Sequence, residues 1–269
     1  MFQVIQGQSR YELQQQILLN PNGLAINTSN RFGDVDALGN ISSIKSVSHP
    51  NFGNNLTNNV LTKQPTLSAA KWGTQNAVFF DHTNFQSLEK LNDTFKPEWN
   101  VERFIGVKFE VFADPSYTGF FTTIYCRGEN ILNRNSVMIA LGGRSGIYFN
   151  KICVQSCAYN TITNSWKVKL IRSVNTFEVG EHSMLYQWGG TNNLIDDKLY
   201  VDGVLEPFVI VINNSFVDST LFPNLAQYLM RYGRNERSDQ FWRGYLGKVI
   251  DSTGVADITN VFNSLNSAI

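Results

Sequence analysis

Hydrophobic and polar residues alternate between residues 101 and 111. One set of alternate positions holds Val101, Arg103, Ile105, Val107, Phe109 and Val111, and Arg103 is its only polar member. The other set includes Glu102, Lys108 and Glu110. A period of two is typical of a β-strand with one buried face, because successive side chains point to opposite sides of a sheet. The segment therefore predicts a strand that is buried on one side.

The same alternation recurs at Trp166, Val168 and Leu170, which are separated by Lys167 and Lys169. It predicts a second strand whose three apolar side chains, Trp166 included, pack in the core. Further short strands are expected at residues 77–80, 120–126, 136–141, 146–154, 183–188, 208–212, 230–233 and 245–250. Their regular spacing, with turn residues between them, is typical of antiparallel all-β proteins.

Two local signals add a hairpin and a helix to this pattern. Asp202-Gly203 stands between the strand-like segments 198–201 and 204–205, which predicts a tight β-hairpin. Near the end of the chain, apolar residues recur at helical spacing in Ile258, Val261, Phe262 and Leu265, after the potential N-cap Asp257. A second short helix is expected at residues 10–19, before the turn residues of segment 20–23.

These elements predict an all-β fold: a two-sheet antiparallel jelly-roll sandwich with a short N-terminal arm and a short C-terminal helix. No strand–helix–strand rhythm favours a parallel sheet. We expect residues 1–48 to be an N-terminal arm or attachment region, because their small apolar and polar residues show no clear period. Residues 49–269 are expected to form the jelly-roll domain.

Composition and charge limit the classes of function that the chain can have. The 269 residues carry 22 basic and 22 acidic side chains, so the formal net charge is zero. A nucleic-acid partner is not expected, because binding to phosphates requires an excess of Lys and Arg. No apolar run approaches the length of a membrane span, and the first residues lack the pattern of a signal peptide, so we expect synthesis in a cytoplasm and no membrane insertion. Three cysteines are too few for a disulfide scaffold.

Four motifs resemble the concanavalin A-like lectin/glucanase family in its laminin-G-like form. Segment 64–67 (QPTL) followed by 76–81 (NAVFFD) resembles the opening of the family domain, although His82 stands where glycine is commoner. Segment 198–203 (KLYVDG) resembles its L-Y-V-D-G hairpin, and segment 241–249 (FWRGYLGKV) resembles its near-terminal strand. The helix expected at 257–265 matches the short helix that often follows. The resemblance covers residues 50–265 and implies two curved antiparallel sheets, face to face.

The resemblance does not imply one function, since the family includes glycan-binding lectins, glycosidases, adhesion modules and virion proteins. Glycosidases of this fold carry carboxylates at alternate positions of one strand, as in E-x-D-x-E, and this chain has no such run. No other catalytic motif is present. We therefore expect no enzyme, although a catalytic pair assembled from distant strands stays an alternative.

Binding residues are expected among aromatic and amide side chains. A sugar ring stacks on an exposed aromatic face while its hydroxyls bond to nearby polar groups. Trp188, close to Asn192 and Asn193, would provide such a platform, and Tyr159 beside Asn160 and Trp166 is an alternative. Asp196 and Asp197 resemble in composition the oxygen-rich loops that hold Ca²⁺ in some relatives, so Ca²⁺ is the one cofactor to consider.

The leading hypothesis is a non-catalytic structural or interaction protein of a bacteriophage virion: a capsid decoration, head-fibre or tail-associated protein made in the host cytoplasm. In this hypothesis the arm docks on other virion proteins through Tyr11, Leu13, Ile17 and Leu18, and the chain forms a homo-oligomer. A carbohydrate-binding module that recognises a host surface glycan is the alternative, and the two roles are compatible. A glycoside hydrolase ranks last.

Overall fold

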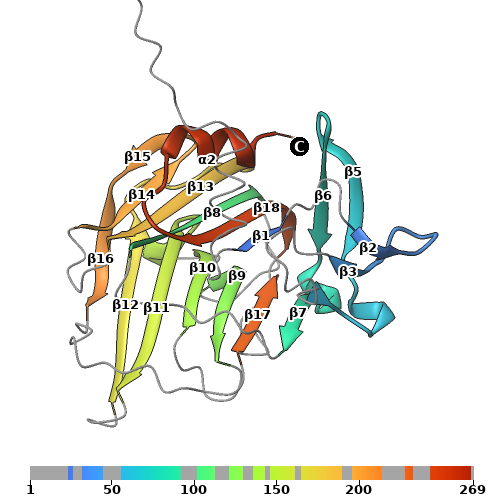
Figure 1. The fold of residues 1–269 in the computed structure, drawn as a ribbon, viewed down its shortest axis with the longest axis horizontal. Coiled ribbons are helices and arrows are strands. Elements are labelled where there is room, and N and C mark those ends of the chain that lie inside the picture. Colours follow the sequence, from blue (N-terminus) through green and yellow to red (C-terminus); the bar gives the residue numbers. More distant parts are fainter. Residues whose placement is uncertain are drawn as a thin grey trace, which may run out of the picture.

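Two antiparallel β-sheets pack face to face and form a sandwich in the computed structural model (Figure 1). The structure describes residues 24–26, 32–44, 56–91, 102–112, 121–129, 136–142, 146–160, 165–189, 196–213, 228–232 and 243–267. The expected fold class is confirmed: both layers are antiparallel, and a short helix near the C-terminus follows the last strand.

Sheet A, the first layer, has the strand order β15-β14-β13-β8-β18-β6-β5. Its strands are β5 (Thr66–Trp72), β6 (Gln75–Phe80), β8 (Glu102–Val111), β13 (Gly180–Gly189), β14 (Lys198–Val201), β15 (Val204–Glu206) and β18 (Gly244–Thr253). Strand β1 (Leu24–Ile26) also pairs with β18, beyond the part of β18 that pairs with β6. The predicted hairpin is confirmed, since Asp202 and Gly203 join β14 to β15 with positive φ angles of 51° and 84°.

Sheet B, the second layer, has the order β16-β12-β11-β10-β9-β17-β7-β4-β3-β2. Its strands are β2 (Phe32–Val35), β3 (Ile41–Ile44), β4 (Leu56–Thr57), β7 (Leu88–Leu91), β9 (Phe121–Glu129), β10 (Ser136–Gly142), β11 (Ile152–Asn160), β12 (Ser165–Ser173), β16 (Phe208–Asn213) and β17 (Tyr228–Tyr232). Three short 3₁₀ turns, Leu61–Lys63, His82–Asn84 and Gly146–Tyr148, lie between strands of the described chain.

The main core fills the space between the two sheets, as the alternation along residues 101–111 predicts. Ile105, Val107, Phe109 and Val111 of β8 are all at most 1% exposed and face this core. They meet apolar side chains of sheet B: Ile124, Val137, Ile139, Leu141, Ile152, Val154 and Ile171. Burial of this apolar surface is the dominant stabilising contribution in a sandwich of this kind.

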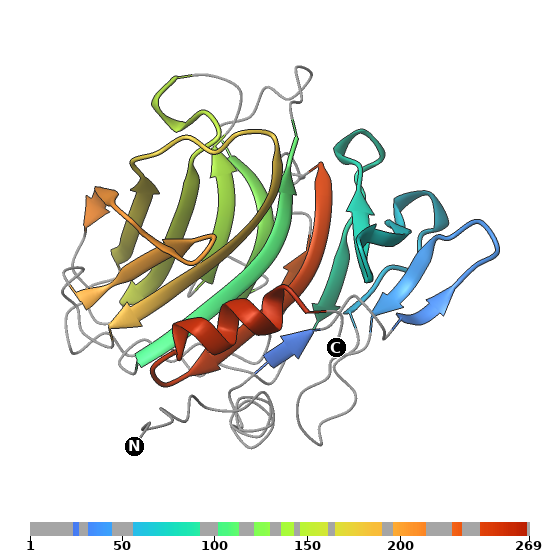
Figure 2. The ribbon, with the colours of Figure 1, turned by 90° about the horizontal axis from the view of Figure 1, so that it is seen from above.

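Helix α2 (Ile258–Leu265) covers part of the outer face of sheet A (Figure 2). Asp257 caps it as predicted, because its carboxylate accepts the Asn260 backbone N–H at 3.0 Å. The apolar helical stripe packs on outward-facing side chains of the sheet, in a cluster of Phe104, Leu185, Ile250, Val261, Phe262 and Leu265. Gly106 permits this close approach, since a Cβ there would lie 3.1 Å from Val261.

A buried charge cluster joins the two sheets at one end of the sandwich. The carboxylate of Asp251 on β18 is fully buried and accepts two bonds from Arg103 Nη2 and one from Nε. It also accepts the hydroxyl of Tyr125, at 2.7 Å, from the opposite sheet. Arg103 is the only polar member of the alternating set in 101–111. Its burial is compensated by the opposite charge of the Asp251 carboxylate.

One predicted face is wrong. On β12 the core side carries Ile171 and also Lys169, which is 2% exposed and lies over the Trp188 ring at 4.6 Å. Val168 and Leu170 belong to the opposite set of positions and are not part of the main core cluster, although Leu170 is buried at 4% exposure. The side chain of Trp166 lies outside the described part, so its predicted core position stays a prediction. The aromatic face of Trp188 and the carboxylate of Asp197 make the buried position of this lysine tolerable, which the local pattern does not reveal.

The described part of the predicted arm is built into the sandwich. Strand β1 pairs with β18 of sheet A, and β2 and β3 extend sheet B. The described part of residues 1–48 thus contributes strands to both sheets, and the division between residues 48 and 49 stays a prediction. These strands have three or four residues each, too few to show a period. Tyr11, Leu13, Ile17 and Leu18 lie outside the described residues, so their docking role stays a prediction. In the described chain, no helix has the length and apolar character needed to cross a membrane.

Substitution of Asp251 by Ala is expected to lower the free energy of unfolding by about 3 to 5 kcal/mol, because it leaves the Arg103 guanidinium buried without its counter-charge. Tyr125→Phe removes one hydrogen bond between the sheets and should cost about 1 to 2 kcal/mol. Urea denaturation measures both values. The exposed Asp196→Ala serves as the control, expected within about 0.5 kcal/mol of the wild type; equal losses for Asp251→Ala and Asp196→Ala would contradict the role of the cluster.

Candidate functional site

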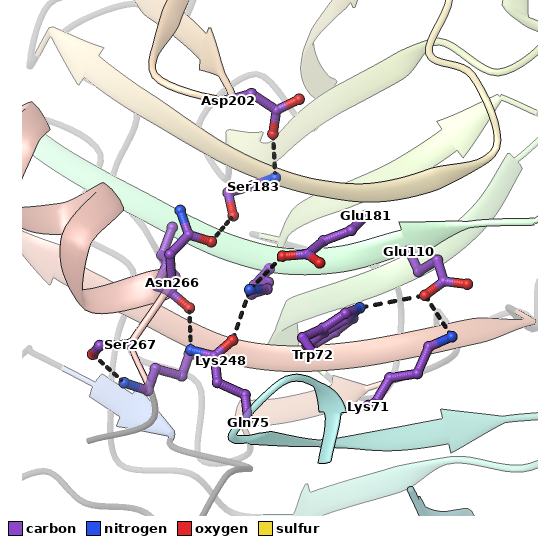
Figure 3. A network of polar contacts seen from close by, with 12 residues as sticks. Lys71, Trp72, Gln75, Glu110, Glu181, Ser183, Asp202, Lys248, Asn266 and Ser267 are labelled. Carbon is purple, nitrogen blue, oxygen red and sulfur yellow. Dashed lines mark hydrogen bonds and ion pairs between the residues drawn. The ribbon is translucent and has the colours of Figure 1, made fainter. Parts of the chain in front are cut away.

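The outer face of sheet A changes character where α2 ends. Beneath the helix it is apolar, but further along β8 and β13 the outward positions carry Lys108, Glu110, Glu181 and Ser183. Together with side chains from β5, the start of β6, β18 and the segment after α2, these residues form the polar contacts drawn in Figure 3. We call this part of sheet A the polar face.

The centre of the polar face is the ammonium group of Lys108, which is almost inaccessible to solvent. Its Nζ lies 2.5 Å from Glu181 Oε1 and donates to Gln75 Oε1 at 2.6 Å. Gln75 in turn donates to the backbone carbonyl of Leu265, at 3.2 Å, in the last turn of α2. Lys108 is thus fixed by a carboxylate and an amide, and the network ties the helix end to the sheet.

Aromatic rings lie beside this network. The Trp72 ring has Lys108 Nζ 4.8 Å from its centroid, and its Nε1 donates to Glu110 at 3.3 Å. Lys71 pairs with the same Glu110 carboxylate at 3.0 Å and lies over the Tyr245 ring at 4.2 Å. Gly247 makes room for the indole, since a Cβ at this position would be 2.7 Å from Trp72 Cζ3.

A pocket of about 380 Å³ opens on the polar face beside α2. It is lined by Glu181, Ser183, Asp202, Gly203, Phe262 and Asn266. The lining combines an apolar ring, from Phe262, with two carboxylates, a hydroxyl and an amide. The volume falls in the range of small-molecule sites, which are typically apolar pockets with a few well-placed polar groups.

The β14–β15 hairpin positions the polar groups of the pocket. Because Asp202 adopts a left-handed turn conformation, its carboxylate folds back on β13 and accepts the Ser183 N–H at 2.7 Å. The Ser183 hydroxyl donates to Asn266 Oδ1 at 3.0 Å, which leaves the Asn266 amide nitrogen as a donor. The carboxylates of Asp202 and Glu181 are about half exposed, at 49% and 43%.

His182 on β13 is hydrogen-bonded to Asp202 and helps to fix the position of its carboxylate. Its Nδ1 is 2.8 Å from Asp202 Oδ2, and its Nε2 is 3.1 Å from the Glu178 carbonyl oxygen. The hydrogen bond to Asp202 raises the pKa of His182 above its usual value, against the opposing effect of burial. Only the protonated imidazolium carries a hydrogen on both ring nitrogens, so it is the form that donates to the Asp202 carboxylate and the Glu178 carbonyl at the same time.

The sequence-predicted aromatic platform is not on the surface. Trp188 is 3% exposed, belongs to the core between the sheets, and faces Lys169 and Tyr186. Tyr159 lies in β11, where it pairs with Trp166, and its side chain is outside the described part. Asn192 and Asn193 also lie outside the described residues. Burial of Trp188 argues against its use as an exposed platform, and the binding roles of Tyr159, Asn192 and Asn193 stay predictions.

The two predicted Ca²⁺ ligands, Asp196 and Asp197, lie in different environments. Asp197 is buried and accepts the Tyr186 hydroxyl at 2.7 Å and the Gly189 N–H at 3.0 Å, whereas Asp196 is exposed. Burial raises the pKa of Asp197, against the effect of these two hydrogen bonds and of Lys169. Within the described ranges, no group of three His, Cys, Asp or Glu side chains has the arrangement of a metal site. The Asp197 carboxylate is thus used inside the fold.

Sequence analysis missed the residues of the pocket. The local pattern at Asp202-Gly203 indicates only a turn, and Glu181 lies in no recognisable motif. Ser183 and Asn266 are 83 residues apart, so no motif of nearby residues links them. The available signal was the family resemblance of the hairpin and of the terminal helix, whose ends meet at this pocket. Cys153, free and buried, is remote from this chemistry, and burial raises the pKa of its thiol to about 12.

The contact between His182 and Asp202 predicts a pH dependence. An unfolded histidine titrates near pH 6.5. Because the folded pKa is higher, the stabilisation is fully present below about pH 6.5 and is lost as the pH rises through the folded pKa. The gain is below about 1 kcal/mol, since Asp202 is half exposed. Asp202→Asn should lower the pKa of His182, which NMR titration measures, and reduce the pH dependence of the free energy of unfolding above about pH 6.5. An unchanged His182 titration in Asp202→Asn contradicts this assignment.

No protein-family model matches the chain, and no curated protein matches its sequence. Solved structures are similar in fold. Domain 4 of AbnA, an extracellular GH43 arabinanase from Geobacillus stearothermophilus in complex with arabinotriose, is 13% identical, with 90% of this chain and 87% of that chain covered at a TM-score of 0.46. The CBM40 of Ruminococcus gnavus IT-sialidase bound to α2,6 sialyllactose is 9% identical, with 61% and 83% covered and a TM-score of 0.35.

A GH54 α-L-arabinofuranosidase is 9% identical and superposes with a TM-score of 0.51, with 85% of this chain covered. This chain spans 51% of that enzyme's length. At such low identities the likeness concerns the fold alone. The structural neighbours of this chain include carbohydrate-binding modules and glycoside hydrolases, and their common element with it is a sandwich of two antiparallel sheets.

Proposed function

We propose that the chain is a non-catalytic carbohydrate-binding protein and that the pocket on the polar face holds the sugar. The observation that carries the proposal is the pocket lining: the Phe262 ring beside Glu181, Asp202, Ser183 and Asn266, in a volume of about 380 Å³. A sugar has a rim of hydroxyl groups, which the carboxylates, the hydroxyl and the amide of the pocket match. The accessible part of the Phe262 ring, which is 8% exposed, adds a small apolar contact for the C–H face.

The fixed geometry of these groups favours binding. Asp202 is held by Ser183 and His182, and Glu181 is held by Lys108. Groups that are already oriented lose little conformational freedom when a ligand binds, which improves affinity. A carboxylate that accepts a hydroxyl forms a charge-assisted hydrogen bond, which is stronger than one between neutral groups.

The same contacts argue against hydrolysis. A glycosidase needs one carboxyl group that donates a proton and a second that acts as nucleophile or base. In this pocket Glu181 is paired with the Lys108 ammonium, and Asp202 is hydrogen-bonded to His182, which adds a positive charge when it is protonated. Such pairing suits hydrogen-bond acceptors rather than a proton donor. The absence of catalysis is part of the proposal, and release of reducing sugar from a polysaccharide would contradict it.

Asn266→Ala tests the site, because Asn266 lines the pocket through its side chain while its backbone caps α2. We expect Asn266→Ala to weaken glycan binding at least about tenfold, the effect of losing a well-aligned hydrogen bond. The measurement is a glycan array followed by titration calorimetry with the strongest binder. Asn263→Ala is the matched control, since Asn263 is exposed on the same helix and does not line the pocket.

Equal affinities of Asn266→Ala, Asn263→Ala and wild type would place the sugar elsewhere. The absence of binding to any glycan would overturn the proposed function. Circular dichroism and the urea midpoint of each variant show whether the sandwich is intact, so that loss of binding is not confused with unfolding.

A structural role in a bacteriophage particle stays a prediction that no described residue tests; the second proposal is its testable part, that the chain forms homo-oligomers. The observation that favours it is the edge strand β16, which has no charged side chain and exposes Val209, Ile210 and Ile212. The neighbouring edge strand β15 exposes Val204 and Leu205. Uncharged apolar edges favour contact between chains, and a second copy of this edge meets it without charge repulsion.

Ile210→Lys is expected to shift the chain from an oligomer to a monomer, because natural sheet edges use lysine to prevent such contacts. Sedimentation velocity at several concentrations measures the change. Asn213→Lys, at the end of the same strand, serves as the control for an added charge. A wild-type chain that sediments as a monomer at all concentrations would contradict the proposal.

A further inference from the structure

We infer that the pocket discriminates sugars by charge: it takes neutral sugar residues and rejects acidic ones, such as uronic and sialic acids. The inference rests on the proposed function and adds the ligand class. It follows from which charged groups on the polar face are accessible to a ligand and which are already occupied.

The cations of the polar face are occupied. Lys108 is 4% exposed and is fixed between Glu181 and Gln75 over the Trp72 ring. Its stem is confined as well, because a Cβ on Gly247 would lie 3.2 Å from Lys108 Cβ. Lys108 therefore cannot turn toward a ligand in the pocket without leaving its carboxylate partner.

The other two lysines of the polar face are similarly engaged. Lys71 is shared between the Glu110 carboxylate and the Tyr245 ring. Lys248 donates to the Ser264 carbonyl at 2.8 Å and to the Ser267 hydroxyl at 3.1 Å, so it neutralises the C-terminal end of α2. None of the three lysines belongs to the pocket lining.

The accessible charges of the pocket are negative. Glu181 and Asp202 both line it, are about half exposed, and face the solvent beside neutral Ser183 and Asn266. Arg and Lys are the usual partners of a ligand carboxylate, because they offer charged donors. The pocket lining contains neither residue, so an acidic sugar has no counter-charge there.

An acidic group in the pocket would meet the exposed oxygens of both carboxylates first and be repelled by them; the buried Lys108 behind Glu181, and His182 behind Asp202 when it is protonated, reduce this repulsion but do not line the pocket. Two unit charges 4 Å apart repel strongly enough in bulk water to weaken binding on the order of fivefold, and more in a partly desolvated pocket. A neutral sugar instead donates its hydroxyls to the same oxygens. The carboxylates thus act both as acceptors for the preferred ligand and as a barrier against its charged analogue.

The test compares matched sugars on the full chain. The probes are neutral trisaccharides of glucose, galactose, mannose and arabinose, a terminal uronic acid version of each hexose trisaccharide, and lactose with sialyllactose. We expect each acidic member to bind at least about fivefold more weakly than its neutral partner, with a larger difference at low salt. Calorimetry at 20 and 300 mM NaCl measures both affinities.

Two variants show whether the pocket carboxylates cause the difference. Glu181→Gln and Asp202→Asn each remove one negative charge and should bring the acidic and neutral sugars closer in affinity. Asp202→Asn keeps an oxygen for the Ser183 N–H, so it carries the test if Glu181→Gln unfolds through loss of the Lys108 partner. Glu102→Gln is the matched control, because Glu102 is exposed at the opposite end of β8 and should leave the ratio unchanged.

The outcomes distinguish a failure of the charge inference from a failure of the proposed carbohydrate binding. Acidic sugars that bind as well as the neutral ones, or better, would overturn the charge inference and leave the proposed carbohydrate binding intact. A ratio that changes equally in Glu102→Gln would also overturn it, since the pocket carboxylates would not be the cause. No binding by any probe would overturn the proposed function, and the inference with it.

Discussion

Strand β8 is buried on both faces, and this constraint organises the molecule. Residues 103–109 are all buried, although only alternate ones face the core between the sheets. The inward set is covered by sheet B. The outward set requires a second cover, which α2 provides over Phe104 and Gly106. Where the helix ends, the cover becomes the polar network around Lys108, and the pocket lies at this transition.

Buried charges define how the two layers fit together. The Asp251 carboxylate accepts hydrogen bonds from Arg103 of its own sheet and from Tyr125 of the opposite sheet. Its position therefore fixes how these two side chains, and with them the two sheets, are placed. Lys169, from sheet B, lies over Trp188 of sheet A. A buried charge without its partner is costly, and each cluster therefore favours one relative placement of the sheets over others. Apolar packing stabilises the sandwich, and these polar contacts add specificity to its arrangement.

Local patterns predicted most of the framework but little of the site. The Asp202-Gly203 turn and the Asp257 cap depend on neighbouring residues, and both are confirmed. The alternation in 101–111 predicted the strand and its inward face, but burial on one side only was wrong, because α2 and the network around Lys108 cover the outer face as well. The orientation of β12 was wrong, because the burial of Lys169 depends on Trp188 and Asp197 from the other sheet. The same long-range packing places Trp188 in the core instead of on the surface. The pocket could not be found from spacing, since a hairpin, a strand and a helix end contribute to it.

The most direct test of the account is an NMR titration of the backbone amides with the neutral trisaccharide that binds best. If the sugar occupies the pocket, the amide signals of Ser183, Gly203 and Asn266 shift together and saturate at one dissociation constant. Saturable shifts centred instead on the amides of Trp188, Asn192 and Asn193 would contradict the assignment, because they would place the sugar at the end of β13 and the residues that follow it.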